Sequence, residues 1–214
     1  DLPMAGPLPD RVVDALVPEG PATSLALAGR AATLEREAAR LRELAATVDD
    51  RRALEAFTKA VSGAEADIDL FRAALFVSKL DNPDLDVDAS CKELDRLAAD
   101  VRARLPADAD EAARLATLNR VLFDELGFHG SRSDYSNRSN SYVNEVLDDR
   151  EGLPITLAIV YLEIGRQLGL KIMGVGMPRH FLTRHEPKNG NQQLVDVFDR
   201  GKLMTPEDAR SKFE

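Results

Sequence analysis

Few side chains in this sequence are of the types needed for covalent or metal chemistry. There is one cysteine, Cys91, and there are three histidines. A single thiol forms no disulfide within its chain and builds no cysteine-based zinc site. His180 and His185 are five residues apart, so on a strand they would lie on opposite faces, which disfavours a shared metal. Because Gly174 and Gly176 precede a strand-like segment rather than a helix, they form no nucleotide fingerprint, and we expect no metal and no cofactor.

Other polar side chains are concentrated in and after residues 129–144, a stretch rich in asparagine and serine with no hydrophobic periodicity. Long polar segments between ordered elements are often functional. The residues of interest here are Asn140, Ser141, Asn144 and Glu145. They either line a polar binding pocket or hold the loop through bonds to the backbone, and we favour the second interpretation. Thr156 follows in the next helix, where a lone threonine is a poor nucleophile and ordinarily bonds to backbone.

The elements before this segment are predicted to be helices. Residues 1–23 are rich in proline and glycine, which predicts an extended or disordered arm. Residues 24–120 form the predicted helical region, in which 31–48 are rich in Ala, Leu, Glu and Arg. Further helices are expected over 65–79, from a cap at Asp88 or Ser90 to 105, and from a cap at 108–110 to 126.

The elements after the polar segment predict a mixed architecture. Pro154 suits the first position of a helix and Gly169 suits the position just past its end. Residues 171–177, 181–184 and 193–198 are short segments bounded by Gly, Pro and Asn, which suits strands, and 189–190 is an Asn-Gly hairpin signal. The predicted class is α+β, with one long helix beside an antiparallel sheet in residues 121–214, packed with the helical region as one unit.

Composition excludes some classes of partner. The net charge of −9, with basic and acidic residues interleaved, argues against nucleic acid. No apolar run approaches the ~20 residues that cross a bilayer, so we expect no membrane span. We find no signal peptide and expect a cytoplasmic protein, although the chain starts at Asp1 and secretion is not excluded.

Residues 123–184 carry a family resemblance through many short pieces in one order. These are Gly127-Phe128 with Gly130, Tyr135, Asn140-Ser141, Asn144-Glu145-Val146-Leu147, Gly152-Leu153-Pro154-Ile155-Thr156-Leu157, Gly169-Leu170, and Pro178 with His180-Phe181-Leu182. The chain resembles the SirB-type branch of the transglutaminase-like proteins. The resemblance implies a helical region followed by a papain-like core, in which one central helix packs on a small antiparallel sheet. Family members often continue into helical repeats, so we expect a core truncated at its C-terminus.

The resemblance also implies which residues occupy the catalytic positions. In active members the nucleophilic cysteine follows a Gly-x pair at a helix start, where the helix dipole favours the thiolate. Here Gly152-Leu153 precedes Pro154, which therefore stands in the cysteine position. His180 resembles the catalytic histidine, and Asp196 resembles the carboxylate that orients it.

Three hypotheses follow. The first is a non-catalytic module that binds a protein or peptide in the cleft around Pro154, Thr156, His180 and the residues near Asn140. The second is a hydrolase, resembling an amidase or protease, that uses His180 and Asp196 with water or a hydroxyl nucleophile. The third is a structural protein whose helices form an interaction platform. A cysteine-dependent transglutaminase or protease is not expected, because proline has no nucleophile. The oligomeric state stays open.

Overall fold

The computed structural model describes residues 6–65 and 68–213, and the chain divides into two units, Asp1–Asp49 and Asp50–Glu214. The first unit contains α1 (Asp10–Leu16), the 3-10 turn η1 (Val17–Glu19) and the start of α2 (Pro21–Ala60). The prediction of an extended arm over 1–23 is wrong for 10–19 and 21–23, which are helical, while residues 1–5 lie outside the described residues. The prolines do not prevent a helix here, because Pro18 and Pro21 occupy the first turns of helices, where a missing N–H is tolerated.

Three helices of the second unit begin at aspartate caps. They are α3 (Leu70–Asp81), α4 (Val87–Ala103) and α5 (Glu111–Asn119), which continues into the π-helical segment η3 (Arg120–Glu125). The carboxylates of Asp69, Asp86 and Asp110 each accept a hydrogen bond from the N–H three residues on. The cap predicted at Asp88 or Ser90 is therefore wrong, and the one near Asp110 is confirmed.

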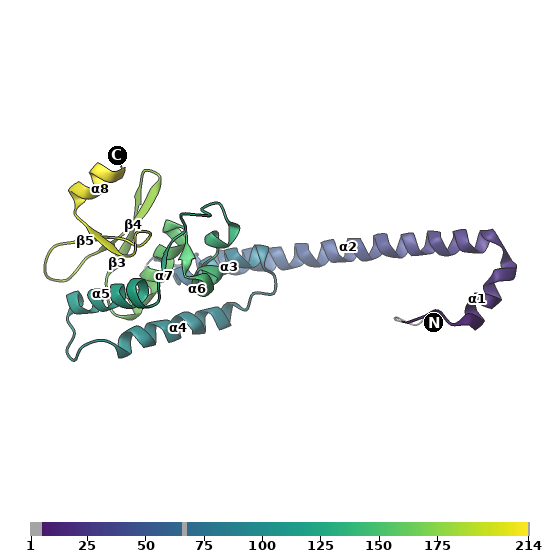
Figure 1. Ribbon diagram of the computed structural model, residues 1–214, viewed down its shortest axis with the longest axis horizontal. Helices are drawn as coiled ribbons and strands as arrows, with labels where there is room; N and C mark the ends of the chain where they lie inside the picture. Colours follow the sequence, from purple (N-terminus) through teal and green to yellow (C-terminus); the bar gives the residue numbers. More distant parts are fainter. Residues whose placement is uncertain (1–5, 66–67, 214) are drawn as a thin grey trace. The chain divides into compact units, whose positions relative to one another are not determined.

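The remaining elements build the core around α7 (Pro154–Gln167), which packs against α3, α4 and α6 as well as the strands β3 and β4 (Figure 1). The other elements are β1 (His129–Gly130), η4 (Arg138–Ser141), α6 (Val143–Asp149), β2 (Glu151–Gly152), β3 (Ile172–Met177), β4 (His180–His185), β5 (Gln193–Asp196), β6 (Lys202–Met204) and α8 (Pro206–Phe213). β1 and β2 pair in parallel, and β3 to β6 form an antiparallel sheet in sequence order. The predicted α+β class is confirmed.

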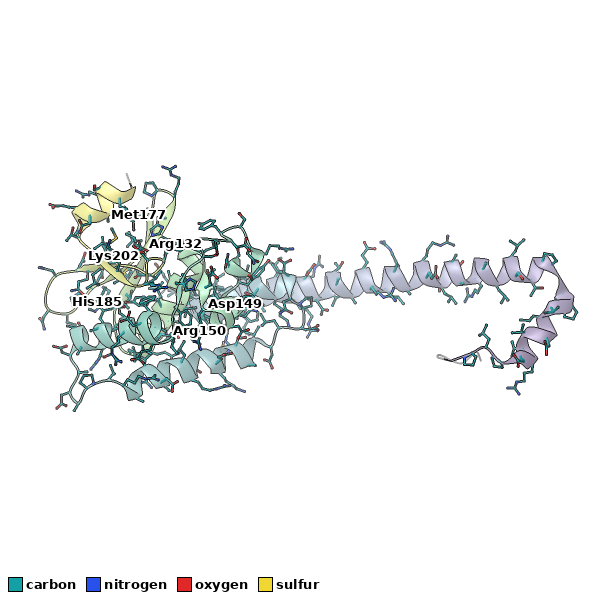
Figure 2. The ribbon with its side chains drawn as sticks, in the orientation of Figure 1. Arg132, Asp149, Arg150, Met177, His185 and Lys202 are labelled. Atoms are coloured by element: carbon teal, nitrogen blue, oxygen red, sulfur yellow. The ribbon has the colours of Figure 1, made fainter. Side chains whose placement is uncertain are left out.

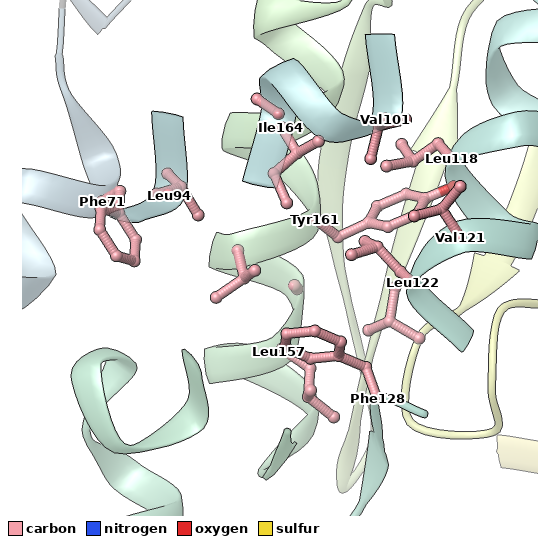
Figure 3. Close-up of a cluster of buried hydrophobic side chains, with 14 of the residues drawn as sticks. Phe71, Leu94, Val101, Leu118, Val121, Leu122, Phe128, Leu157, Tyr161 and Ile164 are labelled. Atoms are coloured by element: carbon pink, nitrogen blue, oxygen red, sulfur yellow. The ribbon is translucent and has the colours of Figure 1, made fainter. Parts of the chain in front are cut away.

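Buried aliphatic and aromatic side chains hold α7 in place. Leu157, Tyr161 and Ile164 of α7 lie in one cluster with Leu118 and Leu122 (Figure 3). Tyr161 stacks on Phe123 and donates its hydroxyl to Asn119 Oδ1 at 2.7 Å, so its polar end is satisfied although the ring is buried. The boundary proposed near residue 120 lies inside this unit, where helices and sheet share the cluster.

Candidate functional site

A tight turn positions His180 at the start of β4. Met177 of β3 pairs with His180 across the two residues Pro178 and Arg179, and Arg179 has a left-handed φ of 56°. β5 pairs with β4 through Thr183 and Val195, which brings Asp196 beside the histidine. His180 Nε2 lies 3.0 Å from Asp196 Oδ1, so the two residues that the resemblance singled out are hydrogen-bonded.

Asp196 is fully buried and holds several donors at once. Besides His180, its Oδ1 accepts the backbone N–H of Asp199 at 3.2 Å. Its Oδ2 accepts from Lys212 Nζ of α8 at 3.1 Å, and Lys212 also lies 3.6 Å from Asp199 Oδ2. A buried carboxylate bound in this way has a fixed orientation, and as an acceptor it orients the His180 ring through Nε2. No sequence pattern had indicated Lys212, because α8 was not predicted.

One aromatic ring packs against the histidine. The Phe198 ring lies edge-on to His180, with centroids 5.9 Å apart, and edge-on to Tyr135 at 6.2 Å. The guanidinium of Arg132 lies 6.0 Å from the Phe198 centroid. We call His180, Phe198, Tyr135 and Arg132 the His180 face. Tyr135 and Arg132 are exposed, Phe198 is half-buried, and the side chain of His180 is only 11% exposed.

Two close contacts fix this face. A Cβ added at Gly130 would lie 2.2 Å from Cδ2 of Phe198, so only glycine lets β1 pass beneath that ring. Gly130 also donates its N–H to the Phe198 carbonyl at 3.0 Å. Arg132 bonds Asp199 Oδ1 at 2.5 Å. Burial by itself raises the pKa of Asp199, but the Arg132 hydrogen bond and nearby cations, Lys212 first, hold it below its ordinary value.

Pro154 and Thr156 both have structural roles at the start of α7. Pro154 is buried at the first helical position. The Thr156 hydroxyl donates to the Asn140 carbonyl at 2.7 Å and accepts the Leu153 N–H at 3.0 Å. Thr156 therefore caps the helix and ties it to the preceding loop. A Cβ at Gly152 would lie 2.7 Å from Cγ2 of Val146 and 2.9 Å from this hydroxyl, which explains the glycine before the helix.

The predicted binding residues around 140–145 divide into separate groups. Asn140 is buried and donates from Nδ2 to the Asp134 carbonyl at 2.7 Å, so it holds the loop, while Ser141 is exposed at the end of η4. Asn144 donates to Glu145 Oε1 at 2.7 Å. Both line a pocket of about 380 Å³ whose other walls are Ser78, Asp81, Asn82, Arg138, Ser139 and Tyr142. Neither Pro154 nor His180 lines that pocket.

The single thiol is unsuited to act as a nucleophile. Cys91 lies on α4 and packs against the main hydrophobic cluster. Burial raises the pKa of its thiol to about 11, although Arg72 partly opposes the shift. Almost no thiolate is present near neutral pH.

His185, labelled in Figure 2, ends β4 and is buried, and it lines a pocket whose walls include Asp110, Glu111 and Lys188 and no residue of the His180 face. Neither ring nitrogen has a hydrogen-bond partner among the described residues. Burial lowers the pKa of His185 and outweighs the opposite effect of Glu111. Within residues 6–65 and 68–213, no three His, Cys, Asp or Glu side chains gather as a metal site, and no helix is long and apolar enough to cross a membrane.

Comparison with known proteins assigns the fold. Residues 88–214 match the model of the transglutaminase-like superfamily. A UPF0162 protein of Xylella fastidiosa is 33% identical over 147 residues, covering 67% of this chain and 50% of the relative. A UPF0162 protein of Vibrio cholerae is 32% identical over 115 residues, covering 54% and 43%. F-box only protein 21 of Homo sapiens is 40% identical over 98 residues, covering 42% of this chain and 16% of that protein.

The chain thus spans about half the length of the UPF0162 relatives that it matches. No solved structure matches it. The match to the superfamily includes α7, the β3–β6 sheet, and both His180 and Asp196. The chain therefore belongs to the transglutaminase-like superfamily.

Proposed function

We propose that this chain is a SirB-type transglutaminase-like domain that has lost cysteine catalysis and binds a protein or peptide on its His180 face. The observation that carries the proposal is Pro154, which is buried at the helix start where the resemblance puts the cysteine. A proline ring has no atom that can attack an acyl carbon, so no thioester forms there.

The states of the Thr156 hydroxyl and of the single thiol support the same proposal. The Thr156 hydroxyl is engaged by Asn140 and Leu153, and Cys91 has a thiol pKa of about 11. What remains is a histidine oriented by a buried carboxylate, next to exposed Tyr135 and Arg132. Tyrosine and arginine are enriched among the residues that dominate binding energy at interfaces. An extended peptide that stacks on Tyr135 and presents an acceptor to Arg132 fits this face.

The binding proposal is tested by selecting ligands from a random peptide library displayed on phage and titrating them against the chain. We expect Tyr135→Ala and Arg132→Ala each to weaken the selected peptides about tenfold or more. Arg96→Ala, at an exposed arginine of α4, is the matched control and should leave affinity unchanged. If the selected peptides bind Tyr135→Ala and Arg132→Ala as tightly as the parent chain, the His180 face is excluded as the binding site.

The alternative is a hydrolase, and the 3.0 Å His180–Asp196 hydrogen bond is the observation that favours it. A histidine held in this way is a general base that activates water without a covalent intermediate. Turnover of a panel of amide and ester substrates tests it, and the activity must disappear in His180→Ala. Turnover that persists in this variant rejects His180 as the base, whereas no turnover at any substrate favours the binding module.

A further inference from the structure

A heptad pattern runs along the part of α2 that lies in the first unit. Leu27, Leu34, Leu41 and Val48 are spaced by seven residues. Three alanines, Ala31, Ala38 and Ala45, follow the first three of them by four residues. With the leucines at heptad position d, the alanines fall at position a, and together these residues form one stripe that we call the heptad seam.

The heptad seam is uncovered. Its four larger side chains are 48–67% exposed, and no residue of α2 before Ala53 is buried. A long helix gains most of its stability in water from packing an apolar face. Apolar a and d positions sustained over three heptads with charged flanking positions are typical of a coiled coil, and α2 is not apolar enough to cross a membrane.

The charges that flank the heptad seam identify the partner. Within residues 27–48, position g holds Arg30, Glu37 and Leu44, and position e holds Ala28, Glu35 and Arg42, so four of these six positions are charged. In a parallel dimer each g side chain faces the e side chain five residues on in the partner helix. Arg30 then faces Glu35 of the other copy and Glu37 faces Arg42, which gives four attractive contacts by symmetry. We propose that residues 27–48 form a parallel, in-register coiled coil with a second copy of this chain.

The opposite orientation does not fit these charges. Consider the antiparallel dimer in which every leucine or valine of the heptad seam lies opposite a small residue, so that Leu27 faces Ala45. In this register position e of one helix faces position e of the other, and Glu35 faces Glu35 of the second copy. Position g likewise faces position g, so Glu37 faces Glu37 of the second copy. Like charges in direct opposition destabilise such a pair, whereas the parallel arrangement contains none.

Sedimentation equilibrium of the 214-residue chain tests the proposal over about 1 to 200 µM. We expect a reversible dimer. Arg30→Glu should raise its dissociation constant about tenfold, because attraction becomes repulsion at two symmetric contacts. Adding Glu35→Arg to that variant should restore the affinity. Arg36→Glu, on the outer side of the helix at position f, is the matched control and should have no effect.

Orientation is tested separately with Ala38→Cys in a Cys91→Ser background. A parallel in-register dimer brings the two introduced thiols together at one layer, so oxidation should crosslink the dimer efficiently. A chain that stays monomeric throughout the concentration range overturns the proposal, since the heptad seam would then pack against another partner or segment. A dimer that is insensitive to Arg30→Glu, or one that does not crosslink, also overturns it.

Discussion

Replacing Thr156 by valine tests whether this side chain serves structure rather than chemistry. Valine has nearly the same shape but no hydroxyl, so the change removes the bonds to the Asn140 carbonyl and from the Leu153 N–H. Each such bond contributes a net 0.5–1.5 kcal/mol or so, which gives a loss of about 1–3 kcal/mol. The Leu153 N–H still reaches the Asn140 carbonyl at 3.3 Å, so neither backbone group is fully orphaned and the loss stays within that range.

The assay is urea unfolding of the second unit, followed by tyrosine fluorescence because the chain has no tryptophan. With a typical urea dependence of about 2 kcal/mol per M, a loss of about 2 kcal/mol lowers the midpoint by about 1 M. Thr156→Ser keeps the hydroxyl and is the matched control, for which we expect a much smaller shift. If the valine variant unfolds at the same urea concentration as the parent chain, the capping role argued for Thr156 is incorrect.

Two further predictions follow from titratable groups whose pKa is shifted by burial. With a pKa of about 11, the folded Cys91 should react with iodoacetamide at pH 7.5 roughly 20-fold more slowly than an exposed thiol, after allowing for the greater nucleophilicity of a more basic thiolate. Equal rates of Cys91 alkylation in the folded and the urea-unfolded chain would contradict this prediction. Because burial lowers the pKa of His185, the unfolded chain binds more protons than the folded chain below about pH 6.5. The free energy of unfolding should therefore fall as the pH is lowered from 7 to 5. This group contributes at most about 1.4 kcal/mol per pH unit to that fall. His185→Leu should flatten that slope in urea titrations at several pH values, and an unchanged slope would refute the assignment.

Local sequence signals determined much of the secondary structure. Pro154 marked the start of α7, and turn residues marked the strands β3, β4 and β5. These predictions succeeded because proline geometry and turn chemistry act within a few residues. The polar stretch 129–144 was expected to be irregular, but it contributes β1, η4 and the start of α6. These short elements have weak propensity and depend on partners distant in sequence, as β1 does on β2.

The candidate site divides in the same way. The sequence alone indicated a polar loop followed by a helix that has no nucleophile at its start. The pairing of His180 with Asp196 rested on family resemblance, and the tertiary structure supplied its 3.0 Å hydrogen bond. Only the fold placed Phe198 against His180 and Lys212 against Asp196, because pairing of β4 with β5 and docking of α8 are long-range contacts. Only the fold separated Asn144 from Asn140, since a side chain's direction is set by what packs around it and not by its neighbours in sequence.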